Sequence, residues 1–155
     1  MAEFGIYGLK AGAGQLAISP MPGRNGDYGA DFAAILDWGP AIVLSMTEEH
    51  ELAVGFHSDL IAAGINVAHM PIVDFGVPDA DDTAFDGIAS ECLAALRDGR
   101  RVLVHCMGGC GRSGMAALRL MIMLGEGPDA ALSRLRAVRP CAVETADQLT
   151  WAQRD

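Results

Sequence analysis

Residues 105–114, His-Cys-Met-Gly-Gly-Cys-Gly-Arg-Ser-Gly, place a cysteine nucleophile, an arginine and a serine among four glycines. The segment follows a short, mainly apolar run at 101–104 and precedes the long apolar segment 115–124, so it joins a buried strand to a buried helix. A glycine-rich turn at a helix N-terminus directs several backbone N–H groups, and the positive end of the helix dipole, at one point. The turn therefore predicts a cradle for a tetrahedral oxyanion.

Cys106 and Arg112 bring a nucleophile and a forked cation to the same predicted anion site, which favours covalent attack on phosphorus. The converging N–H groups, the helix N-terminus and Arg112 all favour the reactive thiolate of Cys106. Arg112 can hold two equatorial oxygens of a phosphoryl group, and Ser113 can donate its hydroxyl to the sulfur. His105 is interpreted as a hydrogen-bonding organiser of the loop and not as a general base. The backbone that binds phosphate would come from Met107, Gly108, Gly109, Cys110 and Gly111, in addition to Arg112. The alternative is a strand–turn–helix junction whose glycines only permit close packing.

The spacing of His105-Cys106, five further residues and Arg112-Ser113 resembles the signature of the cysteine-dependent protein tyrosine phosphatases. Residues 71–79, Pro-Ile-Val-Asp-Phe-Gly-Val-Pro-Asp, resemble the acid-bearing loop of the compact dual-specificity branch, which includes the kinase-associated phosphatase. Residues 22–24 and 143–148 are also similar to that branch. The resemblance implies a protein phosphatase that hydrolyses phosphotyrosine through a phosphocysteine intermediate. In the shallow pocket of so small a chain, phosphoserine and phosphothreonine are further candidate substrates.

This chemistry needs a carboxylic acid that protonates the leaving oxygen. Asp74 is the candidate that the resemblance selects. Asp79, Asp81 and Asp82 crowd the same stretch, and composition alone does not rank them. For Asp81 and Asp82 the favoured interpretation is that they cap the helix that follows, at 83–98.

Supporting roles are expected for two residues near the C-terminus. By resemblance, Gln148 positions the water that hydrolyses the phosphocysteine; the alternative is an exposed helix glutamine. Glu144 occupies a slot where some relatives carry glutamine, and its carboxylate could instead brace Arg112. Glu51 is another candidate brace.

The remaining cysteines and one arginine each leave two interpretations open. Cys110 either points into the wall of the turn or forms a reversible disulfide with Cys106 that protects it from over-oxidation. Cys92 and Cys141 are interpreted as inert buried thiols. Arg24 is either an ordinary surface residue or the holder of a second anion.

Composition limits the partners. With 155 residues, 51% of them hydrophobic, and no linker, the chain is expected to form a single phosphatase domain over residues 1–155. A net charge of −9 disfavours nucleic acid and anionic membranes, so the expected partner is a phosphorylated protein or a small phosphomonoester. The histidines lack ligand-like spacing, and neither a metal nor a cofactor is expected. The first residues lack the basic start and apolar centre of a secretory signal, and the four cysteines have no disulfide-framework spacing, so we expect a reducing, cytoplasmic location.

Strands that alternate with helices predict an α/β fold. We expect a single domain with a mainly parallel sheet of four to five strands, flanked by helices on both faces, with the phosphate-binding loop between a strand and a helix. The nucleophile would then lie at the carboxyl end of a strand, where open α/β sheets bind ligands. The expected strands are 15–19, 41–45, 65–70 and 101–104, and the expected helices are 31–38, 47–63, 83–98, 112–124, 128–138 and 145–153.

Two other classes of function remain open. A non-catalytic phospho-binding module would use Arg112 and the N–H cradle without turnover. A thiol redox protein or arsenate reductase would use Cys106 together with Cys110.

Overall fold

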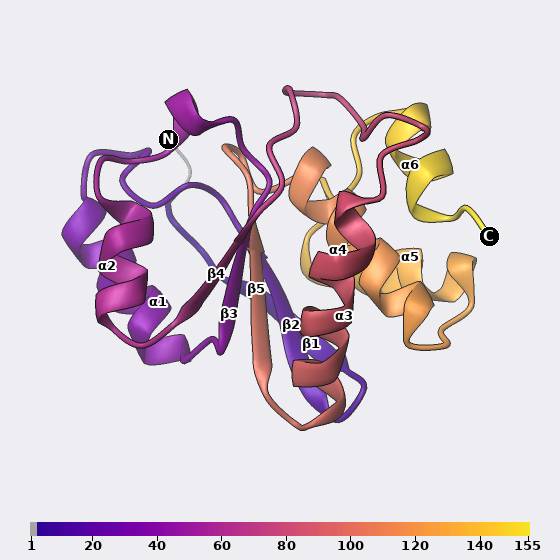
Figure 1. Cartoon of the computed structure of the whole chain (residues 1–155), viewed down its shortest axis with the longest axis horizontal. Helices are drawn as coiled ribbons and strands as arrows, with labels where there is room; N and C mark the ends of the chain where they lie inside the picture. Colours follow the sequence, from indigo (N-terminus) through magenta and orange to yellow (C-terminus); the bar gives the residue numbers. More distant parts are fainter. Residues whose placement is uncertain (1–2) are drawn as a thin grey trace.

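Five strands form one mixed sheet, in the order β1-β2-β5-β3-β4, in the computed structural model, which describes residues 3–155. Strand β1 runs antiparallel to β2, and the other neighbouring strands are parallel. The carboxyl ends of the four parallel strands therefore meet at one edge of the sheet, at the top of Figure 1. The strands are β1 (Tyr7–Ala11), β2 (Gly14–Ser19), β3 (Ile42–Ser45), β4 (Asn66–His69) and β5 (Arg101–His105). This arrangement confirms the expected α/β class.

Helices cover both faces of the sheet, as expected. Helices α1 and α2 pack on one face, and α3 to α6 lie on the other (Figure 1). The two faces follow from the alternation of side chains along a strand: in β5, Leu103 packs with the first group, whereas Val102 and Val104 pack with the second. The helices are α1 (Tyr28–Trp38), the 3₁₀ helix η1 (Glu49–Glu51), α2 (Phe56–Ala62), α3 (Ala84–Arg97), α4 (Gly111–Met123), α5 (Pro128–Val138) and α6 (Ala146–Ala152).

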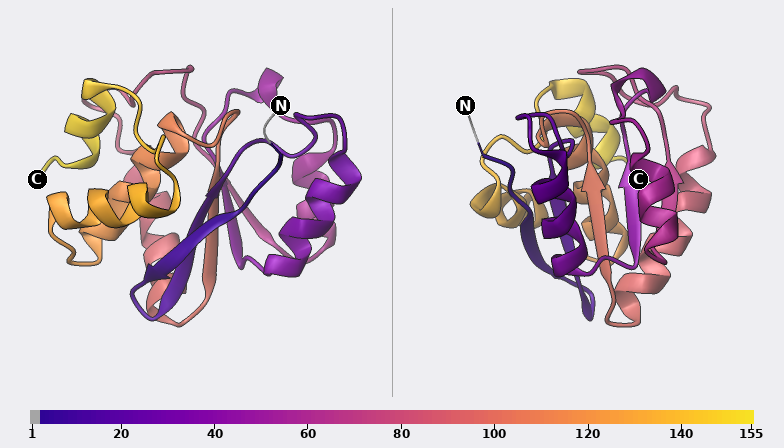
Figure 2. Two further views of the ribbon diagram at one scale, coloured as in Figure 1. Left: turned by 180° about the vertical axis from the view of Figure 1, so that it is seen from behind. Right: turned by 90° about the vertical axis from the view of Figure 1, so that its left-hand side faces the viewer.

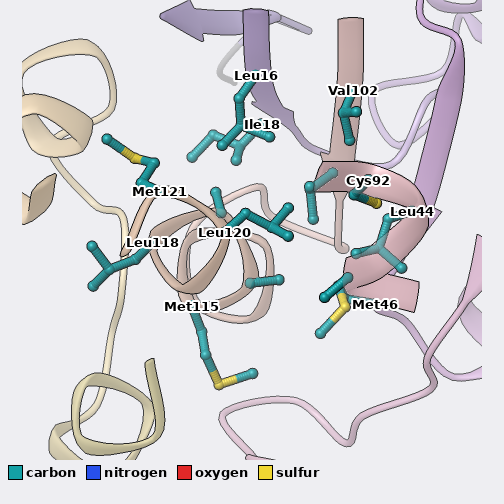
Figure 3. Close-up of a cluster of buried hydrophobic side chains, with 14 of the residues drawn as sticks. Leu16, Ile18, Leu44, Met46, Cys92, Val102, Met115, Leu118, Leu120 and Met121 are labelled. Carbon is teal, nitrogen blue, oxygen red and sulfur yellow. The ribbon is translucent and has the colours of Figure 1, made fainter. Parts of the chain in front are cut away.

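Helix α4, which follows the signature turn, lies in the centre of the larger core. Figure 3 shows Leu120 on the side of the helix that faces Leu44 of β3, with Met115 and Met121 on other sides of the helix. All four of these side chains are completely buried. Burial of each large apolar side chain contributes about 1.5–3 kcal/mol, so the turn is attached to the most firmly packed helix of the fold.

Two elements differ from the expectation. The hairpin strand β1 was not predicted; it lies at the sheet edge (Figure 2, left), where alternate residues are exposed, so it lacks a continuous apolar run. The single helix expected over 47–63 is wrong. Glu48 and Glu51 form a capping box that starts the short helix η1, and η1 is ended by Leu52, whose backbone is extended. Gly55, with φ of 79°, then precedes α2.

Within residues 3–155, no helix has both the length and the apolar character needed to cross a membrane.

Candidate active site

The signature turn lies between β5 and α4, at the carboxyl edge of the sheet. Cys106 follows the last residue of β5 and is only 3% exposed, and its Sγ lies 3.2 Å from Oγ of the buried Ser113. Gly109 has φ of 72°, and a Cβ there would lie 2.5 Å from the backbone nitrogen of Pro20. Only glycine therefore lets the turn pass this close to the end of β2. The contact between Cys106 and Ser113 would become a hydrogen bond from the hydroxyl to the sulfur once the thiol is ionised.

Arg112 is held by Glu51 in a bidentate ion pair. Its Nη1 and Nη2 donate to the two carboxylate oxygens at 2.7 and 2.9 Å, and Nη1 also donates to the carbonyl oxygen of Ile72 at 2.8 Å. Burial opposes the charge of Arg112, but Glu51 and the field of Cys106 hold its pKa above the ordinary value. The hydrogen bond from Arg112 in turn lowers the pKa of Glu51. Glu51 is thus the brace of Arg112, and Glu144 is not.

The Nε of Arg112 is a buried donor without a hydrogen-bond partner among the described residues. A buried donor without a partner costs about 1–3 kcal/mol. An oxyanion in the turn would satisfy this donor, so the arrangement fits an anion-binding site.

Asp74 shares a pocket of about 350 Å³ with Cys106. Its side chain is 58% exposed, and Oδ1 lies 3.5 Å from Nη2 of Arg112. Asp79 instead lines a separate hollow beside α6, and Asp82 accepts a hydrogen bond from the backbone N–H of Ala84 at the start of α3. The structure therefore brings Asp74 to the nucleophile. Asp82 satisfies the first N–H of α3, although Thr83 and not an aspartate is at the N-cap position.

Gln148 and Glu144 have different environments from those expected. Gln148 is completely buried: its Oε1 accepts from the backbone N–H groups of Glu144 and Thr145, and its Nε2 donates to the carbonyl oxygen of Gly76 at 3.3 Å. It is therefore not an exposed helix residue, and it connects the start of α6 to the loop that carries Asp74. Glu144, in contrast, lines the pocket of Cys106.

His105 organises the backbone beneath the nucleophile. Its Nδ1 lies 3.2 Å from the carbonyl oxygen of Cys106, and its Nε2 lies 2.5 Å from Oγ of Ser45. Because a carbonyl only accepts, Nδ1 carries the proton, Ser45 donates to Nε2, and His57 donates to Ser45 across 2.8 Å. Complete burial lowers the pKa of His105 to about 4, so the ring is neutral at pH 7.

A disulfide joins Cys110, in the turn, to Cys141. The interpretation of Cys141 as a free buried thiol is therefore wrong, and in this state Cys110 is not available to pair with Cys106. The other free cysteine in the described part of the chain, Cys92, is buried, and burial raises its pKa to about 12. The positions of the four cysteines in the sequence do not show which of them pair, so the partner of Cys110 could not be predicted from the sequence.

Arg139 is a supporting residue that the sequence did not indicate. It donates to the carbonyl oxygens of Gly109 and Gly108, both at 3.1 Å, and its guanidinium lies 4.2 Å from the ring centre of Tyr7. It therefore turns the carbonyls of the loop outward, which leaves the N–H groups to face an anion. Arg139 ends α5 and nothing in its neighbourhood resembles a motif, so no sequence signal pointed to it.

Within residues 3–155, no group of histidine, cysteine or acidic side chains has the arrangement of a metal site. The turn, its buried arginine and the facing carboxylate define a protein with the site architecture of a cysteine-dependent phosphatase.

Comparisons with known proteins place this architecture in a family. Residues 21–152 match the family model described as a "Swiss Army Knife protein, DSP-PTPase phosphatase domain". This chain belongs to the dual-specificity branch of the protein tyrosine phosphatase family.

Individual relatives agree with this assignment. The human cyclin-dependent kinase inhibitor 3 is 35% identical over 91 residues, which cover 57% of this chain but only 42% of that protein. The crystal structure of the kinase associated phosphatase, with its catalytic-site cysteine substituted by serine, is 26% identical with a TM-score of 0.82 and covers 98% of this chain and 93% of that one. The active form of Tk-PTP is 30% identical with a TM-score of 0.72, over 90% of this chain and 92% of that one.

Proposed function

We propose that this protein hydrolyses phosphate monoesters of phosphorylated proteins, phosphotyrosine above all, through a phosphocysteine at Cys106. The observation that carries the proposal is the placement of Cys106 between Ser113 and the buried, ion-paired Arg112 at the N-terminus of α4. Phosphoserine and phosphothreonine are further candidates, since so small a chain offers only a small pocket, of about 350 Å³, between the signature turn and the loops of Arg24 and Asp74.

In the first step, the Cys106 thiolate attacks phosphorus and the bond between phosphorus and the ester oxygen breaks. The backbone N–H groups of residues 107–111 and the guanidinium of Arg112 bind the equatorial oxygens, whose charge grows in the transition state. Asp74, protonated, gives its proton to the leaving oxygen. The alcohol or phenol then leaves, and the phosphoryl group remains on sulfur.

In the second step, water attacks the phosphocysteine and the bond between phosphorus and sulfur breaks. Asp74, now a carboxylate, accepts a proton from that water, and the hydroxyl of Ser113 stabilises the departing thiolate. Glu144 is the polar side chain of the 143–148 segment that lines the pocket, so we assign to it, and not to Gln148, the orientation of the water. The role of Gln148 is to hold the acid loop through Gly76.

We assign the phosphatase domain to the whole of residues 1–155. The family match ends at residue 152 and begins at residue 21, but β1 and β2, which precede it, complete the sheet next to β5. We also propose that the protein acts in the cytoplasm, where a phosphorylated protein substrate would meet it, on neither a membrane nor a nucleic acid. The disulfide between Cys110 and Cys141 corrects the expectation of fully reduced cysteines, so this location rests on the substrate alone. No metal or other cofactor takes part in either step.

Turnover of p-nitrophenyl phosphate and of phenyl phosphate tests this function. Cys106→Ser is expected to abolish turnover while it still binds vanadate or phosphate. Asp74→Asn is expected to lower kcat on phenyl phosphate by about 100-fold or more, and much less on p-nitrophenyl phosphate, whose leaving group needs little protonation. The same leaving-group pattern in Asp79→Asn, with Asp74→Asn unaffected, would overturn the acid assignment.

The same variants separate the two other candidate functions. A phospho-binding module would bind vanadate in the wild type and show no turnover. An arsenate reductase would oxidise thiols only in the presence of arsenate, and Cys110→Ser would abolish that reaction. The disulfide to Cys141 leaves Cys110 unavailable for a redox reaction with Cys106, and the presence of Asp74 in the pocket of Cys106 speaks against a module that only binds.

A further inference from the structure

Arg24 lies at the rim of the Cys106 pocket, in the loop between β2 and α1. Its Nη1 donates a long hydrogen bond, 3.4 Å, to the carbonyl oxygen of Met107 in the phosphate-binding turn. A Cβ at Gly108 would lie 3.2 Å from the same nitrogen. The absence of a side chain at Gly108 therefore lets the guanidinium lie against the turn.

The loop that carries Arg24 is fixed to the turn by its backbone. The N–H of Met21 donates to Met107 O at 3.0 Å, and the N–H of Arg24 donates back to Met21 O at 3.3 Å. Gly23, with φ of 84°, donates its N–H to Asp31 of α1 at 2.8 Å. Arg24 is thus positioned by the fold and is not simply a surface residue near the site.

The charge of Arg24 remains available, unlike that of the other two arginines at the turn. Arg112 is paired with Glu51, and Arg139 donates to loop carbonyls and lies over the ring of Tyr7. Among residues 3–155, no carboxylate lies within ion-pair distance of Arg24. The rim therefore presents a cation without an ion-pair partner next to the site where a phosphate would bind, in a pocket that Asp74 and Glu144 also line.

We propose that Arg24 binds a second anionic group of the substrate, the carboxylate of a glutamate or aspartate next to the phosphorylated residue of a protein. This inference rests on the proposed function and names its substrate class: phosphoproteins with an acidic residue beside the phosphosite. The planar fork of a guanidinium binds a carboxylate through two parallel hydrogen bonds. A local cation also offsets the repulsion that a chain of net charge −9 exerts on an acidic substrate, because distant surface charges are screened at physiological salt.

Matched phosphotyrosine peptides test the inference. Two peptides differ only by glutamate or glutamine beside the phosphotyrosine, and kcat/KM is measured for both. For the wild type we expect a preference for the glutamate peptide of about three- to tenfold, the range for one exposed, charge-assisted contact. Arg24→Gln should bring the ratio of the two values to about one, and Arg24→Glu should reverse it.

A matched control is Arg97→Gln, which removes an exposed arginine at the end of α3, at the opposite edge of the sheet, and should keep the wild-type ratio. A glutamate preference that persists in Arg24→Gln, or its absence in the wild type, would overturn the inference. A doubly phosphorylated inositol that depends on Arg24 more strongly than the acidic peptide does would also overturn it.

The experiments distinguish a failure of this inference from a failure of the proposed function. If no peptide is turned over, the phosphatase mechanism fails. Calorimetric affinities of the two peptides for Cys106→Ser, with and without Arg24→Gln, then decide the role of Arg24 by the same ratio.

Discussion

Replacement of Glu51 by glutamine removes the charge that braces Arg112 and should damage both stability and anion binding. The carboxylate accepts two charge-assisted hydrogen bonds, at 2.7 and 2.9 Å, from a guanidinium whose side chain is 1% exposed. Loss of one partner of a fully buried ion pair costs about 3–5 kcal/mol. Because Glu51 is 13% exposed and glutamine keeps one acceptor, we expect the free energy of unfolding to fall by about 2–3 kcal/mol.

The same change should lower kcat/KM, since Arg112 must point at the phosphate to stabilise it. We expect a loss of about tenfold or more with p-nitrophenyl phosphate, with a parallel loss of vanadate affinity. Urea unfolding gives the stability, and steady-state kinetics gives the activity. Vanadate affinity separates a misplaced Arg112 from a merely destabilised fold, because it is measured well below the unfolding transition.

Glu49→Gln is the matched control, because Glu49 lies on the same 3₁₀ helix but is exposed. Its free energy of unfolding should stay within about 0.5 kcal/mol of the wild type. If Glu51→Gln behaved like Glu49→Gln in stability, kcat/KM and vanadate affinity, the brace would not have the role that its geometry indicates.

Three further outcomes are expected. Cys141→Ser should lower the free energy of unfolding, measured in urea without reductant, by about 3–4 kcal/mol, which is the chain-entropy value for the 31-residue separation from Cys110. Dithiothreitol should lower the stability of the wild type to the same value, and equal stability in all samples would contradict this. Burial lowers the pKa of His105 to about 4, so the unfolded chain takes up a proton at this histidine before the folded chain does as the pH falls below about 6.5. About 3 kcal/mol of stability should therefore be lost between neutral pH and pH 4. In urea titrations over this range His105→Asn should show a shallower dependence of stability on pH, and an unchanged slope would contradict this prediction. Gln148→Ala removes the hydrogen bond to Gly76 and should lower kcat on phenyl phosphate by about fivefold, the equivalent of one net hydrogen bond, while the affinity for vanadate stays the same. A loss confined to vanadate affinity would refute the role of Gln148 in holding the acid loop.

The local parts of this site could be predicted from the sequence. Consecutive residues show the order of strand, glycine-rich turn and helix, and also the offsets of Arg112 and Ser113 from Cys106. The mainly parallel sheet follows from the alternation of strands with helices along the chain. Contacts between distant segments could not be fixed in the same way. Glu51 and Glu144 were equal candidates for bracing Arg112, because only the fold decides which carboxylate reaches a buried guanidinium.

The remaining differences have the same cause. The pairing of Cys110 with Cys141 joins residues that share no sequence pattern. Gln148 was expected either to position a water or to lie exposed on the helix, whereas it is completely buried and its amide bonds to backbone groups at the start of α6 and to Gly76. Such choices depend on the burial of each polar group and on the partners that lie within reach, which are properties of the folded chain.

The most direct measurement is to trap the covalent intermediate. The protein is mixed with p-nitrophenyl phosphate, quenched with acid within milliseconds, digested and mapped by mass spectrometry. We expect phosphate on the sulfur of Cys106 in the wild type and none in Cys106→Ser. Phosphate on another residue, or turnover that survives in Cys106→Ser, would contradict covalent catalysis by this cysteine.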